Sequence, residues 1–112
     1  MSQAVFVHDG AAIDYTPTAD VAAGEVVVLG DLVGVAKQPI PANTPGALAV
    51  EGVFDFPTES LSGWAVGVLA YWDFNHQRAT WDDAEGDNKL LGKVVLVDSR
   101  PGSPRVRVRM SQ

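Results

Sequence analysis

The stretch Gly24-Glu25-Val26-Val27-Val28-Leu29-Gly30-Asp31-Leu32-Val33-Gly34-Val35-Ala36 contains two short apolar runs separated by a Gly-Asp pair. Valine-rich runs of this length, bounded by glycine and aspartate, are typical of β-strands joined by a tight turn. We therefore expect strands over residues 25–29 and 32–36, with Gly30-Asp31 at the turn between them.

Similar runs continue on both sides of this hairpin. They predict further strands over residues 4–8, 12–16, 47–56, 67–73, 77–81, 90–97 and 105–110. Asp9-Gly10 is expected to join the first two of these as a hairpin, and Gly92 to mark a bulge in the strand 90–97. Residues 58–66 allow either a short helical turn or an irregular loop, because Thr58 could cap a helix that Gly63 interrupts.

About eight or nine short strands in a chain of 112 residues predict an all-β fold. The expected architecture is a small single-domain β-barrel or a jelly-roll-like sandwich, with at most one short helical turn. We expect residues 1–112 to form one domain, with an N-terminal arm at about residues 1–8. Residues 38–46 contain three prolines, and they predict a stiff surface loop because proline fixes the backbone φ angle.

The composition excludes several classes of protein. The chain has no cysteine, which excludes disulfides, thiolate metal sites and cysteine nucleophiles. Its apolar runs are far shorter than the ~20 residues of a membrane-spanning helix, so we expect a soluble protein without a membrane partner. The net charge of −6 argues against nucleic acid as the main partner, because phosphate binding needs a positive surface.

No motif of a catalytic or cofactor site is present. His76 lies close to Asp73 in the sequence, and we interpret it as a solvated turn residue rather than a catalytic base. The acidic residues 82–88 lack the ligand order of a calcium-binding loop and are interpreted as a solvated turn. We therefore predict no enzyme activity, no cofactor and no metal site.

The final strand is a candidate protein-binding element. It alternates Arg105, Arg107 and Arg109 with Val106, Val108 and Met110. Because side chains of a strand point alternately to its two faces, the arginines are expected to face outward. They would either dock on an acidic protein surface through bidentate contacts with carboxylates, or protect an edge strand from pairing with another chain.

The three tryptophans are expected to differ in their roles. Trp72 and Trp81 lie in strand patterns and are expected to fill the core. Trp64 lies in the loop-like segment, and we consider it a candidate anchor of a protein interface, where tryptophan is enriched.

The motifs also occur in a recognisable order from about Val5 to Met110. In sequence they are Asp9-Gly10, Ile13-Asp14-Tyr15-Thr16-Pro17, Ala23-Gly24-Glu25-Val26-Val27, Leu32-Val33-Gly34-Val35-Ala36, Ala47-Leu48-Ala49-Val50-Glu51-Gly52-Val53-Phe54-Asp55-Phe56-Pro57, Tyr71-Trp72-Asp73, Leu91-Gly92-Lys93-Val94 and Val106-Arg107-Val108-Arg109. This ordered set resembles the bacteriophage capsid cement, or head decoration, proteins. The resemblance implies a non-enzymatic structural protein of the virion, made in the cytoplasm of the bacterial host.

The resemblance also implies a partner, the major capsid protein of a tailed phage. Proteins of this kind bind the outer surface of an expanded icosahedral head and bridge neighbouring subunits, which stabilises the head against the pressure of packaged DNA. We expect a homo-oligomer, with a trimer favoured and a dimer or a monomer left open. Arg105, Arg107, Arg109 and Trp64 are the candidate contact residues.

Other classes of protein remain open. One is another virion component, such as a tail or head–tail connector subunit. Residues 24–36 also suggest a biotinyl or lipoyl carrier, although Lys37, Lys89 and Lys93 lack the Met-Lys or Asp-Lys-Ala setting of a modified lysine. A small RNA-binding β-barrel is opposed by the acidic charge of the chain.

Overall fold

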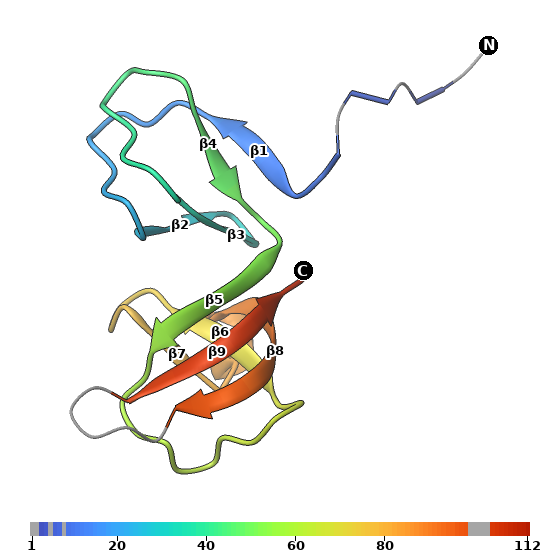
Figure 1. Cartoon of the computed structure of the whole chain (residues 1–112), viewed down its shortest axis with the longest axis vertical. Coiled ribbons are helices and arrows are strands. Elements are labelled where there is room, and N and C mark those ends of the chain that lie inside the picture. Colours follow the sequence, from blue (N-terminus) through green and yellow to red (C-terminus); the bar gives the residue numbers. More distant parts are fainter. Residues whose placement is uncertain (1–2, 5, 8, 99–103) are drawn as a thin grey trace.

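The computed structural model describes residues 3–4, 6–7, 9–98 and 104–112, which form two antiparallel sheets (Figure 1). The first sheet has the strand order β1-β4-β3-β2, with β1 Ala12–Tyr15, β4 Gly46–Ala49, β3 Leu32–Val35 and β2 Val26–Leu29. The second has the order β5-β9-β8-β6-β7, with β5 Gly52–Pro57, β9 Arg105–Met110, β8 Lys89–Asp98, β6 Leu69–Asp73 and β7 Arg78–Thr80. The sheets form a compact sandwich and do not close into a barrel, which confirms the predicted all-β class.

The predicted central hairpin is confirmed. β2 and β3 pair antiparallel, from Val26 opposite Val35 to Leu29 opposite Leu32. Gly30 in the turn has a φ of 62°, in the left-handed region that glycine adopts without steric cost. The apolar runs and the Gly-Asp pair therefore specify both the strands and the turn.

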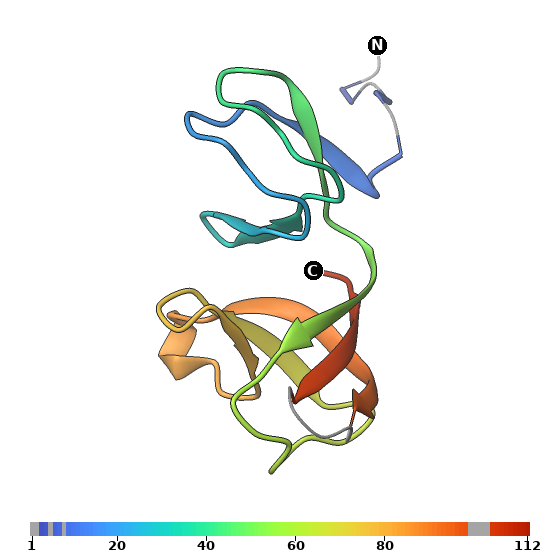
Figure 2. The ribbon, with the colours of Figure 1, turned by 60° about the vertical axis from the view of Figure 1, so that its left-hand side comes forward.

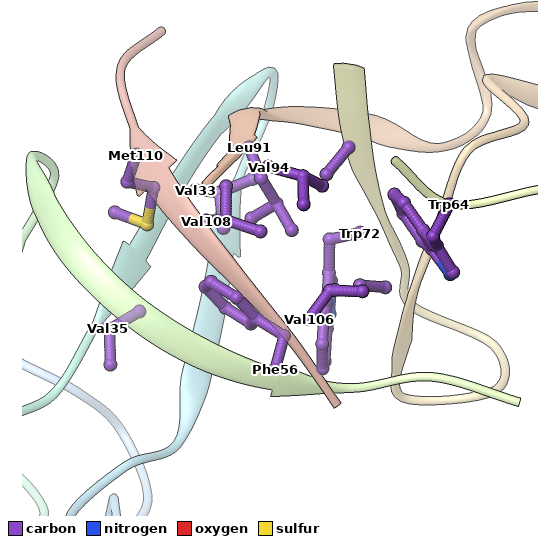
Figure 3. Packing of buried hydrophobic residues seen from close by; sticks show 12 residues of the cluster. Val33, Val35, Phe56, Trp64, Trp72, Leu91, Val94, Val106, Val108 and Met110 are labelled. Carbon is purple, nitrogen blue, oxygen red and sulfur yellow. The ribbon is translucent and has the colours of Figure 1, made fainter. Parts of the chain in front are cut away.

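This hairpin is buried on both of its faces. Val33 and Val35 belong to the larger core, together with Phe56 and Trp72 of the second sheet (Figure 3). Val27 packs instead against a smaller core formed by Val21, Ala36, Ile40 and Leu48. A strand that is covered on both sides has no polar face, which explains why these residues form continuous apolar runs.

The smaller core also fixes the proline-containing segment 38–46. Ile40 is 4% exposed and forms an isolated bridge with Val21, whose two backbone hydrogen bonds are both 2.9 Å long. The neighbouring strands approach closely, since a Cβ added to Gly34 would lie 2.8 Å from the Cβ of Leu48. Glycine at position 34 therefore allows β3 and β4 to pack together.

The prediction of one strand over residues 47–56 is wrong. The segment forms two strands, β4 and β5, which belong to different sheets (Figure 1). The chain passes between the sheets at Val50 and Glu51, and Gly52 has a φ of 134°, a conformation that L-residues rarely adopt. Because the apolar alternation continues through the junction, the sequence pattern does not reveal this break.

The predicted hairpin around Asp9-Gly10 is also wrong. Ala4, Phe6 and Val7 lie in no strand, while Val5 and His8 of the predicted strand are outside the described residues. β1 instead pairs along its whole length with β4, from Ala12 opposite Ala49 to Tyr15 opposite Gly46. A long-range partner has therefore replaced the local one.

The segment 58–66 is an irregular loop, the second of the two predicted alternatives. In the described part of the chain, the one helical turn is η1 (Ala84–Gly86), a 3₁₀ turn between β7 and β8. The bulge predicted at Gly92 is confirmed, because the register of β6 and β8 shifts where Ala70 faces Gly92 and Tyr71 faces Leu90. No helix within the described ranges is long and apolar enough to cross a membrane.

The C-terminal residues lie between the two sheets in both views (Figure 1, Figure 2). The side chain of Gln112 accepts a hydrogen bond from the backbone nitrogen of Val33 at 2.7 Å and donates one to its carbonyl oxygen at 2.6 Å. It thereby ties the end of β9 to the central hairpin of the first sheet.

Candidate protein-binding surface

The arginine row on β9 has the predicted orientation. Val106, Val108 and Met110 are at most 1% exposed, and the arginines between them are on the solvent side. However, β9 is not an edge strand, because it pairs with β5 on one side and with β8 on the other. The edge-protection interpretation is therefore wrong, since both rows of backbone groups on β9 are already paired.

The three arginines have different neighbours. Arg107 lies opposite Asp55, and its Nε and Nη2 atoms donate to the two carboxylate oxygens at 2.9 and 3.3 Å. Arg105 lies opposite Asp98 on β8. Arg109 lies opposite a second cation, Lys93, on the same strand. The row is therefore neutralised in part at one end and strongly positive at the other.

Exposed aliphatic side chains flank the positive end of the row. Val66 is 69% exposed, and Leu69 and Val95 are 43% and 42% exposed. Together with Lys93 and Arg109 they line a groove of about 460 Å³. We call this feature the β8–β9 groove. Arginine and apolar side chains together, without an exposed carboxylate between them, are a composition found at protein interfaces.

Sequence reasoning identified Arg109 but missed Lys93 and the aliphatic residues of the groove. The signal was present in part, because Lys93 stands out as the one charged residue in the run Leu90 to Val97. Its position beside Arg109 depends on the pairing of β8 with β9, which the sequence pattern does not specify.

The predicted exposures of two tryptophans are reversed. Trp64, expected in an exposed loop, is 9% exposed and belongs to the larger core (Figure 3). Its Nε1 donates to the hydroxyl oxygen of Thr58 at 3.1 Å. Trp81, expected in the core, is 56% exposed because β7 ends before it. Trp72 is 3% exposed, as predicted.

The Asp73–His76 pair organises the turn between β6 and β7. His76 Nδ1 lies 2.7 Å from Asp73 Oδ2, and Asp73 Oδ1 accepts from the backbone nitrogens of Asn75 and His76. Burial raises the pKa of Asp73, but these hydrogen bonds and the charge of His76 outweigh it, so the pKa lies below its ordinary value of 3.8. The His76 side chain is 61% exposed, which agrees with a solvated turn residue.

The acidic residues 82–88 use carboxylates to shape their own loop. Asp82 Oδ1 accepts from the backbone nitrogen of Ala84 at 2.9 Å, and Asp83 Oδ1 from that of Glu85 at 3.1 Å. These bonds accompany positive φ angles of 50° at Ala84 and 57° at Glu85. Among the described residues, no group of three or more histidine, cysteine, aspartate or glutamate side chains is arranged to hold a metal ion.

Comparison with known proteins identifies a family for this chain. A family model described as phage cement protein matches residues 7–110. The matched range includes both sheets, the arginine row and the β8–β9 groove. No curated protein and no solved structure matches the chain.

Proposed function

The chain belongs to the phage cement protein family, and from this we propose that it binds the outer surface of an expanded icosahedral head and bridges neighbouring capsid subunits. The family is one of structural proteins associated with the phage capsid. The proposed partner is the major capsid protein of a tailed phage, and the proposed activity is mechanical rather than enzymatic.

The observation that carries this proposal is the outward arginine row on β9. Arg105, Arg107 and Arg109 project from a strand that is hydrogen-bonded on both sides, so the backbone beneath them is held by the sheet. A surface that is already ordered loses little conformational entropy on docking. Arginine also suits contact with carboxylates, because its planar guanidinium forms two parallel hydrogen bonds.

Selective binding explains how such a protein would stabilise a head. A ligand that binds the expanded shell more tightly than the unexpanded shell shifts the equilibrium toward the expanded form. Each contact can be weak, since many copies act on one shell and an oligomer can engage several sites at once. We propose a homotrimer as the binding form, with a dimer as the alternative, made in the host cytoplasm before it joins the virion.

We also propose that residues 1–112 act as a single domain, with an N-terminal arm at about residues 1–8. The central hairpin supports this, because Val33 and Val35 belong to the larger core while Val27 packs against the smaller one. Separation of the two sheets would expose Val33 and Val35, which pack against residues of the second sheet.

Co-sedimentation with head shells of the phage tests the proposed function. Purified protein is mixed with expanded and with unexpanded shells, and the bound fraction is measured over a range of protein concentrations. We expect saturable binding to expanded shells and weaker binding to unexpanded ones, with a copy number that identifies the lattice site. Folded protein that binds neither shell would contradict the proposal and favour a tail or connector role.

A further inference from the structure

Lys93 and Arg109 form an uncompensated pair of positive charges. They lie directly opposite each other on β8 and β9, an arrangement in which like charges destabilise a sheet. In the described ranges, neither side chain has a hydrogen-bond or ion-pair partner. Elsewhere on the same face the chain avoids this situation, since Arg107 is paired with Asp55.

A shortage of acidic residues does not explain this pair. The chain contains 14 aspartates and glutamates against 8 lysines and arginines. One carboxylate placed opposite Arg109, as Asp55 is placed opposite Arg107, would remove the repulsion, yet Val53 occupies the corresponding position on β5. The strand pairing therefore places no carboxylate of this chain opposite Arg109 on β5.

The apolar part of the groove lies beside these charges. Val66, Leu69 and Val95 line it together with Lys93 and Arg109. These aliphatic side chains remain between 42% and 69% exposed, although removal of their remaining apolar surface from water would be favourable. The groove thus offers both an electrostatic contact and an apolar contact to the same partner segment.

The backbone around the groove is fixed before any partner binds. The nitrogen of Gly67 donates to the carbonyl of Val94 at 2.8 Å, and the nitrogen of Val94 donates to the carbonyl of Val68 at 2.9 Å. At Gly92 an added Cβ would collide with the carbonyl oxygen of Arg109, so β8 and β9 approach closely beside the charge pair. Such preorganisation lowers the entropic cost of binding.

We propose that the β8–β9 groove receives a carboxylate-bearing segment of the capsid subunit. An aspartate or glutamate of that segment lies between Lys93 and Arg109, and a neighbouring aliphatic side chain fills the space lined by Val66, Leu69 and Val95. This inference rests on the proposed function and deepens it. It names the chemistry of the partner segment and the part of the arginine row that binds this segment.

The first test compares single neutralising variants on expanded shells. Lys93→Gln and Arg109→Gln are each expected to weaken binding by about tenfold or more, because each leaves a partner carboxylate without one of its cations. Lys37→Gln is the matched control, since it removes one positive charge from an exposed residue outside the groove. Its affinity for the shells is expected to stay within about twofold of wild type, as for a charge outside the contact.

The second test measures the stability of the same variants without shells. Removal of either charge relieves the cross-strand repulsion, so the urea midpoint of unfolding should stay equal or rise while shell binding falls. A fall in both quantities would overturn the proposal, because the two residues would then have a structural role.

A third measurement examines the partner chemistry. Expanded shells whose surface carboxylates are amidated with a carbodiimide and glycinamide should bind the wild type no better than untreated shells bind Arg109→Gln. Unchanged binding to amidated shells would overturn the carboxylate assignment. If the variants dissociate the free protein in analytical ultracentrifugation but bind shells normally, the occupant is a second copy and the proposal is also overturned.

Different outcomes of the shell-binding measurements contradict the proposed function and this inference. Wild-type protein that does not bind shells contradicts the proposed function and this inference together. Wild-type protein that binds, with Lys93→Gln and Arg109→Gln binding as well as Lys37→Gln, contradicts this inference alone.

Discussion

Gly92 lies beside one irregularity of β8, while a second occurs where its register against β9 shifts between Val94 and Leu96. The φ of Gly92 is 157°, and β8 shifts register against β6 beside this residue. Gly92→Ala is expected to lower the free energy of unfolding by about 3 kcal/mol or more, because the added Cβ meets the backbone of Arg109 rather than a movable side chain. Gly10→Ala is the control, since an added Cβ there has no atom within 4 Å. Equal urea midpoints for the two variants would contradict this account.

Asp73 makes stability depend on pH at a single residue. Its folded pKa is lowered, mainly because hydrogen bonds in the β6–β7 turn outweigh its burial, so the folded state binds a proton less readily than the unfolded state. The contribution of Asp73 is therefore complete above the ordinary value of 3.8 and is lost as the pH falls through the lower folded value. We expect Asp73→Asn to be less stable than wild type at pH 6, with the difference shrinking toward pH 2.

Urea unfolding at several pH values measures this difference. His76→Ala serves as the companion variant, because it removes the Nδ1 contact but leaves a backbone nitrogen to bond Asp73. A stability difference between wild type and Asp73→Asn that stays constant from pH 6 to pH 2 would rule out the linkage.

The burial of individual tryptophans could not be predicted from the sequence. The loop position predicted for Trp64 is correct, whereas Trp81, predicted within a strand, follows the end of β7. Burial depends instead on how the 58–66 loop folds back: Gly63 packs against Trp81, and Trp64 reaches the core. The course of this loop depends on tertiary contacts, and no hydrophobic periodicity in the sequence indicates it.

At the scale of the element, the two faces of β9 could be predicted from the sequence, but the strands that pair with it could not. The alternation of arginine with valine gives its two faces, since the side-chain period of a strand is two. Its partners are β5 and β8, and the first lies about fifty positions earlier in the chain. The division between β4 and β5 could not be predicted either, because the apolar alternation continues across the junction at Val50 and Glu51.

Replacement of the arginine row tests this element as a docking surface. The variant Arg105→Ser, Arg107→Ser, Arg109→Ser should remain folded and lose shell binding. Arg107 forms an ion pair with Asp55, with side chains 45% and 39% exposed, and such pairs contribute less than about 1 kcal/mol. Serine also has a lower strand propensity than arginine. We therefore expect the free energy of unfolding of the triple variant to fall by about 1–2 kcal/mol.

Circular dichroism and co-sedimentation measure the two effects on one preparation. A folded variant that binds expanded shells as tightly as wild type would remove the row from the docking surface. An unfolded variant would instead assign the arginines to the stability of the sheet.

At the scale of the molecule, the sequence specified the all-β class through its short apolar runs and frequent turns. It did not distinguish a closed barrel from a sandwich, because closure depends on which strands pair at the edges of a sheet. The binding surface was predictable to a similar extent. Arg109 stands out in the sequence, whereas its juxtaposition with Lys93 arises only from the pairing of β8 and β9.

Both cores should unfold in one transition, because the central hairpin contributes to each. All three tryptophans lie in the part of the chain that follows β5, so their fluorescence reports on the second sheet, while far-ultraviolet circular dichroism reports on both sheets. Leu48 is fully buried in the smaller core, far in sequence from any tryptophan. Leu48→Ala should destabilise the protein by about 2–5 kcal/mol.

The variant should shift the fluorescence midpoint in urea by as much as the circular dichroism midpoint. Coincident transitions in wild type and variant are the mark of a two-state domain. If Leu48→Ala instead splits the circular dichroism curve and leaves the fluorescence midpoint in place, the two sheets unfold independently. The single-domain proposal would then fail, and the first sheet could unfold while the arginine row stayed folded on a shell.

One shared transition means that a contact made at β9 also stabilises the first sheet, through Val33, Val35 and the hydrogen bonds of Gln112.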